Sequence, residues 1–96
     1  MIRSFADQAT ADVYVGQESK AARRIPKSIW PVVRRKLDVL HRARLVQDLR
    51  YPSGNRLEAL KGNRTGQHSI RINDQFRVCF VWTTDGPTDV EIVDYH

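Results

Sequence analysis

Apolar residues in the first half of the chain recur at steps of three and four, as they do along one face of an amphipathic helix. The longest such stripe consists of Trp30, Val33, Leu37, Leu40 and, at its end, Arg44. Ser28 is a good N-cap, and Pro31 falls in the first turn, where a missing N–H is tolerated. The pattern predicts a helix over residues 28–47 and a shorter one over residues 7–17.

The second half of the chain alternates between apolar and polar residues, which is the period of a half-buried strand. Strands are expected over residues 2–5, 68–73, 76–82 and 90–95. Turn residues separate the last three, so these strands should form an antiparallel meander whose apolar face the two helices cover. The sequence predicts an α+β fold, with two helices packed on an antiparallel sheet of four to five strands. Residues 1–96 are expected to form a single domain.

The composition fits a globular protein and excludes several other classes. Of the 96 residues, 41% are hydrophobic and 28% are charged, close to the globular average. The single Cys79 cannot form an internal disulfide, which excludes a disulfide-stapled secreted scaffold. No apolar run approaches the roughly 18 residues that span a bilayer, and the N-terminus lacks the apolar core of a signal peptide. We expect a cytoplasmic protein without a membrane partner.

The net charge of +5 is distributed unevenly along the chain. Residues 20–50 contain ten Lys and Arg against two Asp, a local charge of +8. Residues 78–96 contain no Lys or Arg and carry a charge of −4. Solvated helix faces account for part of the basic residues, yet so dense a field is typical of a polyanion-binding surface. Arg34, Arg35 and Lys36 on the long predicted helix are therefore candidates for contacts with RNA or the ribosome.

Common catalytic and metal-binding motifs are missing from the sequence. Cys79 has no partner at metal-ligand spacing, and His41, His68 and His96 are dispersed, so neither a metal site nor another cofactor is expected. The glycine-rich segment at residues 61–67 lacks the Gly-Lys-Ser/Thr ending of a P-loop.

Charged and titratable side chains instead gather in the second half of the chain. The glycine-rich loop and the outward face of the following strands supply Lys61, Arg64, Arg71 and Arg77, and the last strand ends in Asp94, Tyr95 and His96. Cleavage of RNA needs a base for the 2′-hydroxyl, cations for the phosphorane and an acid for the leaving oxygen. Lys61 and Arg77 would hold the phosphate, while Asp94 and His96 would exchange protons. Arg64 and Arg71 are further candidates for contacts with RNA or the ribosome. Tyr95 would stack on a base, and the substrate itself supplies the nucleophile.

The same residues also fit structural roles. Arg77 would equally pair with Asp94 or Glu91 across the strands, and cations in a loop are often merely solvated. Tyr95 suits the edge of a core, and His96 suits an ordinary chain end. Spacing alone therefore does not establish an enzyme.

Four stretches of the chain resemble the HigB-type branch of the RelE/ParE superfamily, bacterial toxins of type II toxin–antitoxin modules. They are Met-Ile-Arg-Ser-Phe at the start, residues 55–64, residues 69–77 and the terminal Val-Asp-Tyr-His. The similarity covers nearly the whole chain. It implies a compact domain with helices packed on an antiparallel sheet and a metal-independent endoribonuclease that cleaves mRNA in the ribosomal A site.

The resemblance also implies roles for individual residues. The catalytic set by position is Lys61, Arg77, Asp94, Tyr95 and His96. Lys61 and Arg77 would bind and stabilise the scissile phosphate. Glu58 occupies a position at which several relatives have a histidine. A carboxylate there would either act as a base or repel the phosphate and weaken the nuclease.

The partners implied by the resemblance are a cognate antitoxin, the ribosome and its mRNA. The antitoxin would be a HigA-type helix-turn-helix protein, and operator DNA would be bound only through the antitoxin complex. ParE-type toxins keep the fold but poison DNA gyrase, so the fold alone does not assign the target. The terminal Asp-Tyr-His favours RNA cleavage. Two other functions remain as alternatives: a non-enzymatic toxin that inhibits a protein such as gyrase, and a non-catalytic module that binds nucleic acid.

Overall fold

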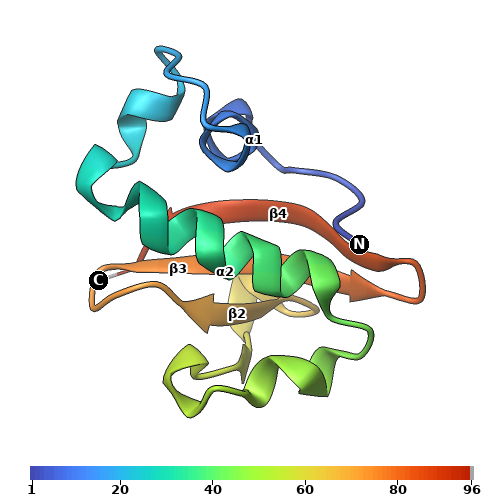
Figure 1. Ribbon diagram of the computed structural model, residues 1–96. Helices are drawn as coiled ribbons and strands as arrows, with labels where there is room; N and C mark the ends of the chain where they lie inside the picture. Colours follow the sequence, from blue (N-terminus) through green and yellow to red (C-terminus); the bar gives the residue numbers. More distant parts are fainter. Residues whose placement is uncertain (96) are drawn as a thin grey trace.

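A computed structural model describes residues 1–95 and shows two helices on one side of a four-stranded sheet (Figure 1). The helices are α1 (Gln8–Val15) and α2 (Trp30–Arg42). The strands are β1 (Glu58–Ala59), β2 (His68–Arg71), β3 (Phe76–Thr83) and β4 (Gly86–Asp94). Short 3-10 turns occur at η1 (Ala22–Arg24), η2 (Lys27–Ile29), η3 (Val46–Arg50), η4 (Ser53–Asn55) and η5 (Gly62–Arg64). The strands pair in the order β1-β2-β3-β4, each antiparallel to its neighbour, which confirms the predicted fold class and meander.

The hydrophobic core lies between the sheet and the two helices. α2 crosses the sheet, and α1 lies beside β4 (Figure 1). The fully buried core residues include Val33, Leu37, Leu40, Ile70, Val78, Phe80 and Ile92. Four positions of the predicted stripe, from Trp30 to Leu40, are buried in this core, so the apolar face of α2 is the one that periodicity indicated.

α2 ends five residues earlier than predicted. The chain leaves the helix at Ala43, which adopts an extended conformation with ψ 136°. The cause lies farther along, because the Asp48 carboxylate accepts hydrogen bonds from the backbone N–H of Arg44 and Leu45 at 3.1 and 3.0 Å and starts the turn η3. Arg44 is therefore exposed rather than part of the stripe. Ser28 does not cap the helix, since it lies within η2, and the N-cap position is Ile29.

The ends of the strands also differ from expectation in detail. β4 begins at Gly86 because Thr84 and Asp85 alone make the turn, and Gly86 already lies opposite Thr83. The segment predicted as a strand over residues 2–5 forms only a single parallel bridge, between Phe5 and Val90. α1 falls within its predicted range of residues 7–17. In the part of the chain that the structure describes, no helix is long and apolar enough to cross a membrane.

Candidate active site on the outer face of the sheet

Alternate residues of the strands point away from the helices and form the outer face of the sheet. In one row across the four strands lie Glu58, Ser69, Cys79 and Glu91, and in the next row lie Arg71, Arg77 and Val93. Directly opposed residues share a face, and the core residue Val78 points the other way. The outward placement of Arg71 and Arg77 that alternation predicted is thereby confirmed.

Arg77 is the best-anchored cation of the outer face. Its side chain is 13% exposed and turns across β2 toward β1. Nε donates a hydrogen bond to Ser69 Oγ at 2.8 Å, and NH2 donates to the backbone carbonyl oxygen of Arg56 at 2.6 Å. NH1 lies 3.6 Å from the Glu58 carboxylate. The Arg77 guanidinium is therefore held in one orientation by three different groups.

Tyr95 completes the surroundings of Arg77. Its ring centroid lies 5.9 Å from the Arg77 guanidinium carbon, within the range of a cation–π contact. The Tyr95 backbone N–H donates to the Gln75 carbonyl at 2.6 Å, which ties the C-terminal segment to the β2–β3 turn. Tyr95 is 44% exposed, so part of this residue stays open to a ligand beside Arg77. The structure thus brings Glu58, Arg77 and Tyr95 together.

Arg64 forms a second anchored cation on the same face. Its NH1 donates to Glu91 at 2.8 Å and to Gln67 Oε1 at 2.9 Å, and the hydrogen bond to Glu91 raises the pKa of Arg64. One structural interpretation of the sequence paired Glu91 with Arg77. In the structure Glu91 pairs with Arg64 instead. Cys79 is buried on this face, and burial raises the pKa of its thiol.

The remaining candidate residues lie apart from this cluster. Lys61 is exposed at the start of η5, and Arg71 is paired with Asp74 in the adjacent turn. Asp94 lies opposite the core residue Phe76, which places it on the helix side of the sheet by register, and it accepts a hydrogen bond from Gln75 Nε2 at 3.1 Å. The proposed catalytic His96 lies outside the described residues.

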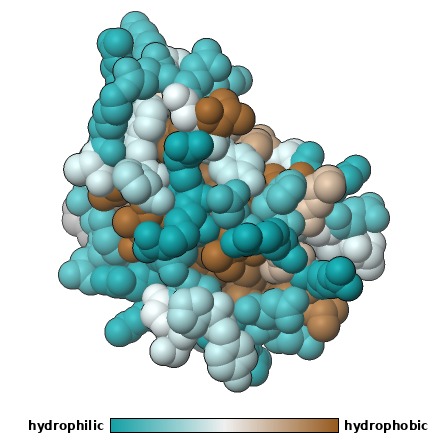
Figure 2. Space-filling model, viewed as in Figure 1, coloured by the Kyte–Doolittle hydropathy of each residue, from teal (hydrophilic) through white to brown (hydrophobic). Residues whose placement is uncertain are grey.

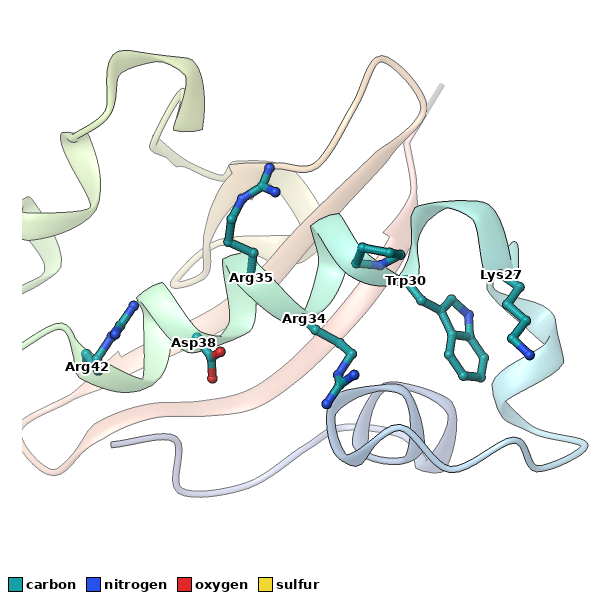
Figure 3. A pocket seen from close by; sticks show the side chains of 7 residues that line it. Lys27, Trp30, Arg34, Arg35, Asp38 and Arg42 are labelled. Carbon is teal, nitrogen blue, oxygen red and sulfur yellow. The ribbon is translucent and has the colours of Figure 1, made fainter.

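The basic face of α2 lies on the other side of the molecule from the outer face. The surface that carries α2 is largely hydrophilic with apolar patches between (Figure 2). A shallow groove of about 450 Å³ runs along it and is lined by Lys27, Trp30, Pro31, Arg34, Arg35, Asp38 and Arg42 (Figure 3). Arg34 and Asp38 point toward α1, where each contacts Tyr14, and Arg35 points the other way (Figure 3). Arg34 and Arg35 are exposed, as an RNA-binding role requires.

Lys36 differs from its two neighbours on α2. Its ammonium group donates a hydrogen bond to the side-chain oxygen of Asn55, which is fully buried. Asn55 in turn donates to the carbonyls of Leu49 and Tyr51 at 3.2 and 3.1 Å. Burial lowers the pKa of Lys36, with further contributions from Arg35 and Arg71. Lys36 thus holds the loop that precedes β1.

Two groups that hold Arg77 on the outer face were not identified from the sequence. Ser69 is fully buried and accepts a hydrogen bond from Arg77; alternation places it on the face of Arg71, but nothing in the sequence indicated a role for it. The Arg56 carbonyl had no sequence signal, because its position depends on a left-handed backbone at φ 47° and ψ 58°. Among residues 1–95 no three or more His, Cys, Asp or Glu side chains gather as metal ligands would.

A solved structure has the same fold as this chain. The chain matches one chain of the YoeB–YefM complex from Staphylococcus aureus with a TM-score of 0.62 and 19% sequence identity, over 100% of this chain and 98% of that chain. The family described as the RelE-like toxin of type II toxin–antitoxin system HigB matches residues 3–96.

Relatives in sequence agree with the family match. The chain is 41% identical over 96 residues to Toxin HigB-1 of Vibrio cholerae. The alignment covers 100% of this chain and 98% of that protein. An uncharacterised protein of Haemophilus influenzae is 37% identical over 57 residues, 59% of this chain and 56% of that protein. The chain belongs to the HigB-like toxins of type II toxin–antitoxin systems, within the RelE superfamily.

Proposed function

We propose that this toxin is a ribosome-dependent endoribonuclease that cleaves mRNA in the A site and so inhibits translation. The observation that carries the proposal is the Arg77 guanidinium, which is fixed on the outer face beside Glu58 and under the exposed ring of Tyr95. An oriented cation is what a developing phosphorane needs, and an open aromatic ring is what an unstacked base needs. Membership of the HigB-like family supports the assignment.

The proposed reaction uses the RNA itself as the nucleophile. The 2′-oxygen attacks the adjacent phosphorus, its proton passes to a base, and the 5′-oxygen leaves with a proton from an acid. The products are a 2′,3′-cyclic phosphate and a 5′-hydroxyl, and no metal ion takes part. Arg77 and Lys61 bind the phosphate oxygens, and Tyr95 stacks on a base. Glu58 serves as the base. Asp94, which lies on the helix side of the sheet, and His96, assigned from the sequence, exchange protons at the C-terminus and supply the acid.

Primer extension on mRNA after induction of the toxin tests this proposal. Arg77→Ala and deletion of His96 are expected to reduce the cleavage products and restore growth, while Arg3→Ala on the distant N-terminal segment leaves both unchanged. Cleavage at the wild-type rate in both site variants would remove the assignment. If the toxin instead inhibits the supercoiling of DNA by gyrase and leaves mRNA intact, its target is a protein such as gyrase.

Glu58 has two opposed roles that one substitution separates. As a base, its carboxylate accepts the 2′-hydroxyl proton, and Glu58→Gln is expected to lower single-turnover cleavage by about 100-fold. As a competitor for Arg77, at 3.6 Å, it repels the phosphate, and the same substitution would raise the rate. We propose the first role. A rate equal to or above that of the wild type contradicts it.

The proposal extends to the partners of the toxin. We infer a cognate antitoxin of the HigA type, with a helix-turn-helix domain, and binding of operator DNA only through the toxin–antitoxin complex. The likeness to a chain of a YoeB–YefM complex supports an antitoxin partner. In a mobility-shift assay with its own promoter, the toxin alone is expected to cause no specific shift, and the complex is expected to cause one. We also infer a cytoplasmic location, because the ribosomes on which the toxin would act lie there.

A further inference from the structure

The Arg77 guanidinium is held chiefly by two uncharged acceptors. Ser69 Oγ accepts from Nε at 2.8 Å, and the Arg56 carbonyl oxygen accepts from NH2 at 2.6 Å. An arginine carries five N–H donors in a planar fork. Nε and NH2 each donate one hydrogen bond to these acceptors, and NH1 lies 3.6 Å from the Glu58 carboxylate, so the hydrogen bonds to described residues use two of the five donors.

Ser69 has a position that suits it to fix Arg77 and little else. It lies between Glu58 and Cys79 in the row across the sheet, one row away from Arg77, and it is fully buried. A diagonal neighbour on an adjacent strand is within reach of a long side chain. A hydroxyl restrains the guanidinium plane without neutralising its charge, whereas a carboxylate there would compete with a phosphate.

The second acceptor belongs to the turn before β1. Arg56 adopts a left-handed conformation, φ 47° and ψ 58°, which is unfavourable for a residue with a Cβ. Asn55 holds this turn from within, because its buried side chain donates to the Leu49 and Tyr51 carbonyls and accepts from Lys36. The hydrogen bonds of Asn55 thus tie the turn that carries the Arg56 carbonyl to the neighbouring backbone and to α2.

We propose that Ser69 and the Arg56 carbonyl form a brace that fixes the guanidinium plane of Arg77, and that Ser69 is a positioning residue for RNA cleavage. The inference rests on the proposed function, because it takes Arg77 as the ligand of the scissile phosphate. Ser69 acts through Arg77 and does not touch the substrate. A pre-oriented fork presents its free N–H groups to the phosphate without a search over rotamers.

The first test uses the folded toxin alone and reads the Nε–H of Arg77 by NMR. Its resonance is assigned by its absence from Arg77→Lys, and its exchange with water is measured. Slow exchange is expected in the wild type, and exchange faster by about 10-fold or more is expected in Ser69→Ala. The matched control is Cys79→Ala, which removes one heavy atom from the opposite, equally buried position and should leave the exchange slow. Unchanged exchange in Ser69→Ala overturns the brace.

The second test measures single-turnover cleavage of mRNA on purified ribosomes at several toxin concentrations. Ser69→Ala is expected to lower the maximal rate by about 10- to 100-fold, with the half-saturating concentration unchanged, because docking uses other surfaces. Ser69→Thr keeps the hydroxyl and is expected to stay within about threefold of the wild type, as is Cys79→Ala. A Ser69→Ala rate equal to that of the wild type overturns the positioning role. If the wild type itself leaves ribosome-bound mRNA intact, the proposed function fails, and the exchange measurement still decides the brace.

Discussion

Lys36 carries a charge on the basic helix but directs it toward the protein rather than toward solvent. Its ammonium group satisfies the side-chain oxygen of Asn55, a fully buried amide whose own N–H groups bind two backbone carbonyls. A buried polar group that loses its partner destabilises the fold by more than the hydrogen bond contributes. The density of positive charge in the sequence therefore overstates the charge that α2 offers to a polyanion.

Replacing Lys36 by alanine is expected to lower the free energy of unfolding by about 1–3 kcal/mol, because the Asn55 oxygen is left without its donor. The neighbouring Arg35→Ala changes an exposed side chain and is expected to stay within about 0.5 kcal/mol of the wild type. Urea unfolding followed by circular dichroism measures both. Equal stabilities for the two variants would show that the hydrogen bond from Lys36 to Asn55 does not stabilise the fold.

Asp12 gives the stability of the fold a pH dependence. Its carboxylate accepts hydrogen bonds from Ser19 Oγ at 2.5 Å and Gln8 Nε2 at 2.7 Å, which lower its pKa below the ordinary value of 3.8. The stabilisation is fully present above that value and is lost as the pH falls below it, through the lowered pKa. Between about pH 5 and about pH 2.5, the Tm of the wild type should fall more than that of Asp12→Asn. The exposed turn variant Asp85→Asn should follow the wild type.

At the scale of elements, the N-terminal segment is fastened to the β3–β4 hairpin. The Arg3 N–H donates to the Pro87 carbonyl at 2.8 Å, and the Ala6 N–H donates to the Val90 carbonyl at 2.9 Å. Gly86 lies at φ 119°, and a Cβ there would collide with the Met1 carbonyl. The start of the chain therefore covers an edge of β4 that would otherwise be open to pairing.

Gly86→Ala is expected to destabilise the protein by about 1–3 kcal/mol, through both the positive φ and the collision with Met1. Gly54→Ala is the matched control, since a Cβ at Gly54 meets nothing within 4 Å. It should leave the stability unchanged or raise it by about 0.4–1 kcal/mol. Thermal unfolding of the two variants measures the difference. A loss in Gly54→Ala as large as that in Gly86→Ala would contradict the packing argument.

Sequence patterns predicted these elements well where the signal is local. The stripe on α2 and the alternation in β2 and β3 identified the faces that pack in the core. The end of α2 was missed because it depends on the side chain of Asp48, which lies four residues after Arg44 and accepts a hydrogen bond from its N–H. Hydrophobic periodicity carries no information about such a contact. β1 has two residues and no pattern of its own, so the contact between Glu58 and Arg77 could not be predicted before the register of the sheet was known.

At the scale of the whole molecule, the two basic regions face opposite ways. α2 packs its apolar stripe on the sheet and turns Arg35 and Arg42 to solvent. Arg77 and Arg64 lie on the outer face, where each is restrained by neighbouring side chains. Restrained cations suit catalysis, since they keep one geometry, and free cations suit docking, since a phosphate backbone rewards charge more than orientation. On this interpretation the toxin docks with one surface and cleaves with the other.

This division predicts that docking and cleavage can be weakened separately. The double charge reversal Arg35→Glu with Arg42→Glu is expected to raise the toxin concentration for half-maximal cleavage on ribosomes by about 10-fold or more, and to reduce the dependence of that concentration on salt. The maximal rate at saturation should stay that of the wild type, because Arg77 and its brace are untouched. The pair Arg3→Glu with Lys20→Glu gives the same net charge elsewhere on the surface and serves as the control. If the control shifts the half-maximal concentration as much as the α2 pair does, net charge and not the α2 surface brings the toxin to the ribosome.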